Sequence, residues 1–488
     1  MRIETDFIGA VDIPDNALYG IHSLRAAKNF PDAGVFHTEW YQAAGTVKKA
    51  CYITYKKYAA AVHASHPGVM LPVPLFSDHI TDALIKAAEE VENGIHVKDF
   101  IVPALQGGAG TSINMNVNEI IANRALQQLG YHPGDYRFID PIEHANIFQS
   151  TNDVIPTSLR VAVIRLLKNL EISINNLRTS LEDKEKTSRH HMRIAYTQMQ
   201  EAVPSSYGRL FSAYCDAVSR DWWRVSKCFE RIKVVNLGGS AIGTGITVPR
   251  YFISEVTRVL QQVSGLPLTR AENMHDATSN LDAFVEVHAI LKAHAVNLEK
   301  IVSDLRLLSS DLVRSREIQI PKLQTGSSVM PGKVNPVVPE FVVSAAHKVY
   351  ANDQLVSSLC GLGCLDLNAY LPAIGHALIE SLKLLIACDE TLKINLLDGL
   401  HFNNSVAAEN LLLSPSITTA LLPFIGYHKS ALLAAEMRSG NISILEANRK
   451  LKFLPAQQLK MIIEPSQLLK EGFTLNDIIE NHGERKGE

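Results

Sequence analysis

The sequence predicts a mainly all-α protein organised around a long helical bundle. Apolar residues recur at intervals of three and four over residues 163–181 and again over residues 284–312, which is the spacing of one helix face. The second stripe covers about 30 residues, or roughly 45 Å at 1.5 Å per residue. Helices of this length cannot bury their stripes within a small domain, so the pattern predicts an extended bundle and packing between subunits.

Both stripes consist of large aliphatic or aromatic residues. The first is formed by Val163, Leu166, Leu170, Ile174, Leu177 and Leu181, and the second by Phe284, Val287, Leu291, Leu298, Ile301, Leu305, Leu308 and Leu312. His294 fills the one missing position of the second stripe. We expect it to be a hydrogen-bonded histidine of the helical seam rather than a metal ligand.

The composition is that of an ordinary globular protein. The 488 residues suffice for two or three domains, and the net charge of -3 implies no nucleic-acid or membrane electrostatics. The chain has no run of 18 apolar residues, and its start, residues 1–6, has no apolar signal segment. We therefore expect a cytoplasmic protein that binds neither nucleic acid nor membranes.

Six cysteines are scattered along the chain, too few for a disulfide framework in a protein of this length. Cys360 and Cys364 lie four residues apart, but no second close pair or histidine cluster completes a zinc site. We expect buried free thiols in a reducing compartment, no bound metal and no cofactor.

The order of Gly, Pro and apolar residues predicts three regions. Residues 1–40 contain several glycines and prolines and should be irregular or short-stranded, whereas residues 40–97 should be helical, with a break before a second helix capped by Ser77. After residue 396 the pattern changes to shorter helices. The predicted domains are residues 1–140, a central long-helix domain at 141–396, and a small helical domain at 397–488.

A polar loop lies between long helical patterns at residues 321–340. It holds two glycines and four prolines, so it cannot be a regular helix or strand. It also contains Ser327, Ser328, Lys333 and Asn335. Mobile polar loops on rigid scaffolds are where catalytic residues tend to lie.

Two further polar clusters precede helical patterns. In residues 106–118 glycines lead into Thr111, and the free N–H groups of such a helix start can bind an anion such as a carboxylate. Residues 149–157 offer Ser150, Thr151 and Asn152. Each cluster could also be a simple helix cap. The glycine-rich residues 236–245 do not follow the dinucleotide-binding pattern.

The loop motif Gly-Ser-Ser-x-Met-Pro-x-Lys-x-Asn at residues 326–335 resembles the signature of the aspartase/fumarase superfamily. Residues 17–26, 106–118, 149–157 and 196–204 resemble other stretches of the same superfamily, in the same order. The resemblance implies a three-domain helical fold with a central bundle. It also implies a homotetramer whose active sites gather segments from three subunits.

The chemistry implied by the resemblance is an anti elimination that yields fumarate from a four-carbon dicarboxylate. Ser327 matches the family's catalytic base, which removes a C3 proton and leaves an aci-carboxylate. A serine can do this only as an alkoxide stabilised by a donor-rich loop. The other residues that the resemblance assigns to substrate binding are Thr111, Ser150, Thr151, Asn152, Thr197, Gln198, Lys333 and Asn335, with Arg25, Ser328, Met330 and His144 as further possibilities.

Gln198 indicates which group leaves, because most family members have histidine at the matching position. A glutamine amide cannot protonate a departing hydroxide, whereas an ammonium group can leave as neutral ammonia. Gln198 and Asn152 could accept hydrogen bonds from that ammonium. This favours elimination of ammonia from L-aspartate; a fumarase-type hydratase or another lyase of the superfamily is the alternative, and a non-catalytic relative a remote one.

A second departure from the family lies at Asp140-Pro141-Ile142-Glu143-His144. Fumarases carry a histidine of a secondary carboxylate site where this chain has Asp140, so we expect that secondary site to be missing. His144 is retained, and its role could be to support the active site or simply to stabilise the local structure.

Overall fold

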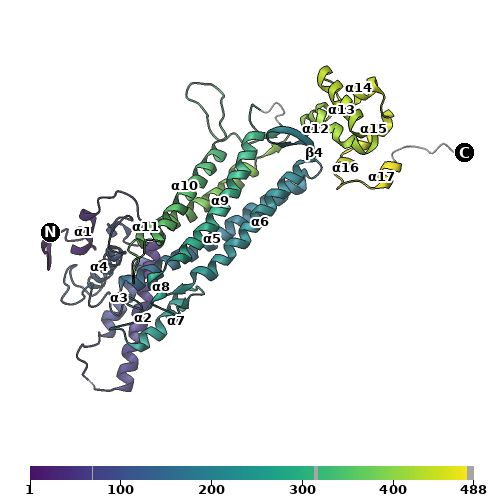
Figure 1. The fold of residues 1–488 in the computed structure, drawn as a ribbon. Coiled ribbons are helices and arrows are strands. Elements are labelled where there is room, and N and C mark those ends of the chain that lie inside the picture. Colours follow the sequence, from purple (N-terminus) through teal and green to yellow (C-terminus); the bar gives the residue numbers. More distant parts are fainter. Residues whose placement is uncertain (69, 313–316, 481–488) are drawn as a thin grey trace. The chain divides into compact units, whose positions relative to one another are not determined.

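The computed structural model describes residues 1–68, 70–312 and 317–480. The predicted mainly α-helical fold is confirmed, with long helices that form a bundle (Figure 1). In the described residues the strands form two-stranded sheets, of which β1–β2, β3–β4 and β7–β8 are antiparallel and β5–β6 is parallel.

The chain divides into two compact units that alternate along the sequence. Unit 1 comprises Met1–Ile172, Trp223–Ala295 and Ala346–Ile386. Unit 2 comprises Ser173–Trp222, Val296–Ala345 and Ala387–Glu488. The predicted boundaries at residues 140 and 396 stay a prediction.

The elements before the first long helix belong to unit 1. They are β1 (Arg2–Asp6), β2 (Gly9–Ile13), α1 (Ile21–Asn29), α2 (Thr38–Ser65), α3 (Asp78–Glu92), the 3-10 turn Val97–Asp99 and α4 (Thr111–Gln128). Helix α1 was not expected in the irregular region predicted for residues 1–40. The predicted cap of α3 is confirmed, because the Ser77 hydroxyl accepts a hydrogen bond from the Ile80 backbone N–H.

Long helices make up the middle of the chain. They are α5 (Thr151–Ser188), α6 (Tyr207–Ile232), α9 (Asp282–Leu308), α10 (Val337–Cys360) and α11 (Leu371–Thr391). The shorter elements among them are β3 (Met192–Thr197), β4 (Gln200–Ser206), β5 (Val234–Val235), α7 (Arg250–Ser264), β6 (Thr269–Arg270), α8 (Asp276–Ser279) and β7 (Ile318–Gln319).

Short helices follow, as the sequence predicted. The helices are the π-helical turn η2 (Leu392–Leu397), α12 (Asn404–Leu413), the 3-10 helix η3 (Pro415–Leu421), α13 (Leu422–Gly440), α14 (Ile444–Leu451), α15 (Ala456–Ile462), α16 (Pro465–Leu468) and α17 (Leu475–Glu480). The strand β8 (His401–Phe402) lies between η2 and α12. Their core includes Met192 and Ile194 of β3. The hairpin β3–β4 therefore packs as part of this C-terminal region, although the sequence did not predict strands there.

The apolar stripe of the first long helix is buried at every predicted position from Val163 to Leu181. In the second stripe, burial continues to Leu308, where helix α9 ends, and the last predicted member, Leu312, is 89% exposed. The seam is therefore shorter than predicted. His294 is buried in α9, as expected for a seam histidine.

Buried polar groups fix helices of the bundle against one another within unit 1. His288 of α9 lies with Nδ1 3.2 Å from Asp353 Oδ1 of α10 and Nε2 2.9 Å from Ser381 Oγ of α11. The three residues share the connectivity of a Ser-His-Asp triad, but His288 and Ser381 are both 0% exposed. Because no substrate could reach this serine, the arrangement is a structural link between three helices.

The cysteine prediction is partly wrong. Cys51, Cys215, Cys228 and Cys388 are buried free thiols, but Cys360 is only partly buried and Cys364 is exposed. Cys364 lies beyond the end of α10, in a short loop whose backbone pairs Cys364 with Leu367, and its side chain is therefore not on the helix face. Burial raises the pKa of the Cys360 thiol to about 12, so this side chain stays protonated at neutral pH.

The segment Leu371–Leu397 is long and apolar enough to cross a membrane by length and composition, with a mean hydropathy of 1.5. In the apolar 18-residue stretch of this segment, 61% is buried inside the structure. The core helix of a soluble protein has the same properties, so this observation alone does not indicate a membrane protein.

Candidate active site

The start of helix α4 is shaped by three residues with left-handed backbone. Gly108, Ala109 and Gly110 all have positive φ, and Gly110 holds the cap position, so Thr111 is the first helical residue rather than the cap. The Thr111 hydroxyl donates a hydrogen bond to the Gly108 carbonyl over 2.8 Å. Left-handed Ala109 is costly, and such strain is often found at binding sites.

Arg25 and Thr111 border the same cavity of about 420 Å³, which is also lined by His22, Gly107 and Gly108. The Arg25 guanidinium is held in place, because its Nε and Nη2 donate to the two carboxylate oxygens of Asp6, each over 2.9 Å. A cation beside a helix N-terminus is a suitable environment for a carboxylate. The structure thus places Arg25, which the resemblance gave only as a possible site residue, at the same cavity as Thr111.

A buried carboxylate ties α1, which carries Arg25, to α4, which begins at Thr111. Glu119 of α4 accepts hydrogen bonds from the backbone N–H groups of Gly20 and His22, over 2.7 and 2.9 Å, and from Ser23. Burial raises the pKa of Glu119 to about 7, and these donors oppose that rise. Glu119 therefore caps α1 from the neighbouring helix.

Helix α5 begins inside the second predicted cluster, and Asp153 organises its first turn. The Asp153 carboxylate accepts from the Ser150 N–H over 2.9 Å and from the N–H groups of Gly238 and Ser240 over 3.1 and 3.0 Å. The Ser150 hydroxyl accepts from the Asn152 N–H. Burial raises the pKa of Asp153 to about 6 despite these donors.

Pro156 explains how the glycine-rich loop is attached to the same turn. Proline has no N–H, so the Asn152 carbonyl four residues earlier lacks its helical partner. The Asn236 side-chain amide donates to that carbonyl over 2.9 Å. In return the Asn152 amide donates to the Ala241 carbonyl over 2.8 Å. The glycine-rich residues 236–245 thus dock on the start of α5.

A buried lysine contributes positive charge in the interior of unit 1. Lys48 is 0% exposed, and its Nζ lies 3.3 Å from Asn146 Oδ1. Burial lowers the pKa of Lys48 to about 7, while Asp153 stabilises its charged form. Lys48 and Asp153 thus interact electrostatically, and each stabilises the charged form of the other.

The loop with the family signature is closed at a tight neck in unit 2. The Gly326 N–H donates to the Lys333 carbonyl over 2.7 Å, and the Asn335 amide donates to the Gly326 carbonyl over 2.8 Å. A Cβ atom at Gly326 would lie only 2.7 Å from the backbone nitrogen of Asn335. Glycine is therefore required at this position for the close approach of the two loop ends.

Ser327 lies just inside this neck with its hydroxyl oxygen facing N–H donors. The oxygen accepts from the Val329 N–H over 3.1 Å and from the Met330 N–H over 2.9 Å. Two such donors stabilise negative charge on the oxygen, as the serine-base prediction requires. Ser328, Met330 and Lys333 are exposed on the same loop, and Ser327, Met330 and Lys333 border a cavity of about 360 Å³.

Thr197 and Gln198 lie at the turn of the hairpin β3–β4, where Thr197 pairs with Gln200. Gln198 and Met199 form a two-residue turn with φ values of 52° and 61°, which favour Gly or Asn rather than these residues. Met199 is 79% exposed. A strained turn that presents exposed side chains is consistent with a binding role for Gln198.

His144 and Asp140 stabilise a local turn. His144 Nδ1 accepts from the Asp140 N–H over 3.1 Å, and its ring stacks on Phe76. Asp140 accepts from the N–H groups of Ile142 and Glu143 over 2.7 and 2.9 Å. Of the two roles considered for His144, these contacts support the structural one.

The predicted residues fall into two groups. Unit 1 holds Arg25, Thr111, His144, Ser150, Thr151 and Asn152, and unit 2 holds Thr197, Gln198, Ser327, Ser328, Met330, Lys333 and Asn335. Each group is ordered by its own hydrogen bonds. Among the residues the structure describes, no group of three or more His, Cys, Asp or Glu side chains could hold a metal ion.

The sequence interpretation overlooked three carboxylates that position these groups: Asp6, Glu119 and Asp153. A signal was present for Asp153, because Ser150-x-x-Asp153 is the spacing of a helix-capping box. Asp6 and Glu119 act over 19 and about 100 residues of sequence separation, so no local pattern could reveal them.

Comparisons with known proteins identify the family of the chain. Residues 9–351 match a family model described as lyase, and residues 417–470 match one described as fumarase C C-terminus. An aspartate ammonia-lyase of Helicobacter pylori is 38% identical over 96% of this chain and 98% of its own length. The match to the lyase model covers more than half of the chain, which therefore belongs to this lyase family.

Solved structures give the same assignment. A fumarate lyase:delta crystallin from Brucella melitensis, bound to cobalt, has a TM-score of 0.88 and 34% identity over 96% of this chain and 100% of its own. A class II fumarase from Schistosoma mansoni has a TM-score of 0.83 and 26% identity over 95% and 98%. The resemblance to the aspartase/fumarase superfamily is confirmed.

The substitution Asp153→Asn should destabilise the protein by about 2–4 kcal/mol. Both carboxylate oxygens of Asp153 accept hydrogen bonds, whereas an amide has only one oxygen, so at least one buried N–H group would lose its acceptor. Urea unfolding at fixed protein concentration measures this change. Asp216→Asn, at an exposed position on α6, is the control and should stay within about 0.5 kcal/mol. An equally small effect at Asp153 would show that this carboxylate does not organise α5.

Proposed function

We propose that the chain catalyses the reversible anti elimination of ammonia from L-aspartate to give fumarate. The observation that carries this proposal is the Ser327 oxygen, which accepts from two backbone N–H groups in a signature loop. Relatives of nearly the same length, in Helicobacter pylori and other bacteria, are named aspartate ammonia-lyases. The proposed role of Ser327 is that of the base.

In the proposed mechanism Ser327, as an alkoxide, takes the C3 proton next to a substrate carboxylate. The Val329 and Met330 N–H groups lower the cost of forming the alkoxide. Charge then spreads into the carboxylate as an aci-carboxylate dianion. Lys333, with its carbonyl held in the loop neck, supplies the cation for this charge, and Asn335 holds the neck closed from the other side.

The substrate carboxylates are assigned to the helix starts at Thr111 and at Ser150–Thr151, with Arg25 beside Thr111. This assignment rests on the N–H groups at the starts of α4 and α5 and on the cavity shared by Arg25 and Thr111. Such groups bind the ground state and the transition state alike, so they should set the affinity more than the rate.

The leaving ammonium is assigned to Asn152 and Gln198. The donor end of the Asn152 amide is already bound to the Ala241 carbonyl, so its oxygen is the end that can meet an ammonium group. Gln198 presents a second amide oxygen at an exposed turn. Neither side chain can protonate a hydroxide, and this supports ammonia rather than water as the leaving group.

Fumarase is the second candidate, favoured by the structural likeness to the Schistosoma mansoni enzyme. Absorbance of fumarate at 240 nm separates the two reactions when L-aspartate and L-malate are supplied in parallel. We expect aspartate deamination and negligible malate dehydration. Comparable rates on both substrates would refute the argument from Gln198, and no reaction on either would favour a non-catalytic relative.

Ser327→Ala should lower kcat by about 10³-fold, or about 4 kcal/mol of transition-state stabilisation, with little effect on carboxylate binding. Ser328→Ala is the matched control and should be mild, because Ser328 lies one residue past the assigned base, and the Val329 and Met330 N–H groups donate to Ser327. Lys333→Arg should rescue little relative to Lys333→Ala, since a planar guanidinium does not replace a point charge in a tight loop. Single-turnover fumarate formation measures all four.

If Ser327→Ala stayed within about tenfold of the parent while Ser328→Ala collapsed, the wrong serine would be assigned. If both variants stayed fast, the serine-base mechanism would not apply to this chain.

We infer a homotetramer with active sites shared between subunits. One ground is the family resemblance, and the other is that the long helices carry exposed apolar side chains. In the single chain, for example, Ile172 and Trp223 are 60% exposed and Phe341 is 41% exposed. Light scattering should give four chains. At an L-aspartate concentration below KM, where Ser327→Ala lacks the base and Thr111→Val binds substrate weakly, mixing the two kinds of subunit should restore part of the activity, because mixed tetramers contain some intact sites. An active monomer, or no recovery on mixing, would contradict shared sites. The cytoplasm remains the expected compartment.

A further inference from the structure

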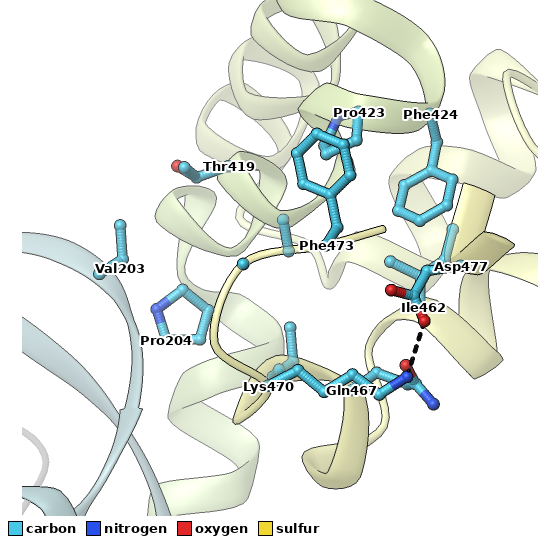
Figure 2. Close-up of a pocket in the computed structure, with 13 residues that line it drawn as sticks. Val203, Pro204, Thr419, Pro423, Phe424, Ile462, Gln467, Lys470, Phe473 and Asp477 are labelled. Carbon is cyan, nitrogen blue, oxygen red and sulfur yellow. Dashed lines mark hydrogen bonds and ion pairs between the residues drawn. The ribbon is translucent and has the colours of Figure 1, made fainter. Parts of the chain in front are cut away.

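Unit 2 contains a cavity apart from every candidate active-site residue (Figure 2). Its volume is about 510 Å³, within the range of about 300–1,000 Å³ that is usual for small-molecule sites. The walls come from β4, η3, α13, α15 and the chain between residues 467 and 477. The cavity is large enough for a compact metabolite rather than a peptide.

Most of the lining is apolar. Phe424 and Pro423 of α13, Ile462 of α15 and Phe473 border the cavity, with Val203 and Pro204 of β4 on another side. Phe473 is 59% exposed although it borders this hollow. An aromatic ring left partly in water beside an apolar cavity can gain burial when a ligand with an apolar body enters.

One ion pair lies at the same cavity. The Lys470 Nζ lies 2.9 Å from Asp477 Oδ1, while Asp477 Oδ2 accepts from the Thr474 N–H and hydroxyl over 2.7 and 2.9 Å. These bonds, first the one from Lys470, lower the pKa of Asp477 to about 2, so it is ionised throughout the physiological range. The charged end of the cavity therefore presents a cation and an anion in direct contact.

We propose that this cavity binds an α-amino acid with an aromatic or branched apolar side chain. The ligand carboxylate lies against Lys470, its ammonium lies against Asp477, and its side chain lies against Phe424 and Phe473. Two opposite charges side by side select a zwitterion, because a purely anionic or cationic ligand meets one repulsive partner. This proposal goes beyond the proposed lyase function and does not rest on it.

The site also borders a strand that leads to a candidate active-site residue. Pro204 of β4 pairs with Ile194 of β3, and the turn between these strands carries Gln198. An occupant of the cavity would therefore contact the hairpin that supports Gln198.

Isothermal titration of the full-length protein with L-phenylalanine tests the proposal. We expect a Kd on the order of 0.1–1 mM, unchanged when fumarate is present at saturation. 3-Phenylpropanoate and 2-phenylethylamine, which each keep one charge, should bind at least about tenfold more weakly, or about 1.4 kcal/mol.

Phe473→Ala should weaken L-phenylalanine binding at least tenfold. Lys470→Met and Asp477→Asn should each remove the preference for the zwitterion over the singly charged analogues. Tyr427→Ala is the matched control, because Tyr427 is an aromatic residue of α13 that is 72% exposed and does not border the cavity. Circular dichroism of each variant verifies that it remains folded.

The proposal would be overturned by absence of binding at about 10 mM L-phenylalanine or by equal binding to folded Phe473→Ala protein. It would also be overturned if fumarate displaced the ligand, which would place L-phenylalanine in the active site. Equal or tighter binding of 3-phenylpropanoate would refute the zwitterion assignment.

Discussion

The buried carboxylate of Asp153 is the interaction on which the arrangement of the helix α5 start depends. It joins the cap residue Ser150 to two N–H groups of the glycine-rich loop, Gly238 and Ser240. Burying a charge is costly, and here three N–H donors and the nearby Lys48 offset the cost. Because of this network the 38-residue helix α5 begins with ordered polar groups at residues 150–152.

Carboxylates that accept several hydrogen bonds also order the residues around Arg25 and Thr111. Glu119 lies in the interior and accepts from the first turn of α1, and Asp6 holds the Arg25 guanidinium through both carboxylate oxygens. Carboxylates from elsewhere in the chain thus position the cationic and N–H groups that we assign to substrate carboxylates. A rigid arrangement of this kind is what a preorganised binding site requires.

The loop with the family signature, residues 326–335, is ordered differently. Its ends are pinned by two hydrogen bonds at Gly326, while the residues beyond the neck, including Lys333, are exposed. The Ser327 oxygen meets its two N–H donors directly beside this neck, whereas Lys333 is exposed. The hairpin turn at Gln198 and Met199 adds a second exposed and strained segment in unit 2.

The sequence by itself determined the helical fold class, the family and the serine of the signature loop. These follow from local information, namely the spacing of apolar residues along α5 and α9 and the fixed positions of residues 326–335. Short-range patterns also revealed the cap at Ser77 and contained an overlooked signal for Asp153.

Only the tertiary structure decided which groups hold those residues in place. The bond from Gly20 to Glu119 joins positions 99 residues apart, and the bond from Asn236 to the carbonyl of Asn152 joins positions 84 residues apart. Such contacts arise because buried donors and acceptors must find partners wherever the fold brings them. The exposure of Leu312 and Cys364 was likewise decided by where a helix ends, which the apolar spacing did not contain.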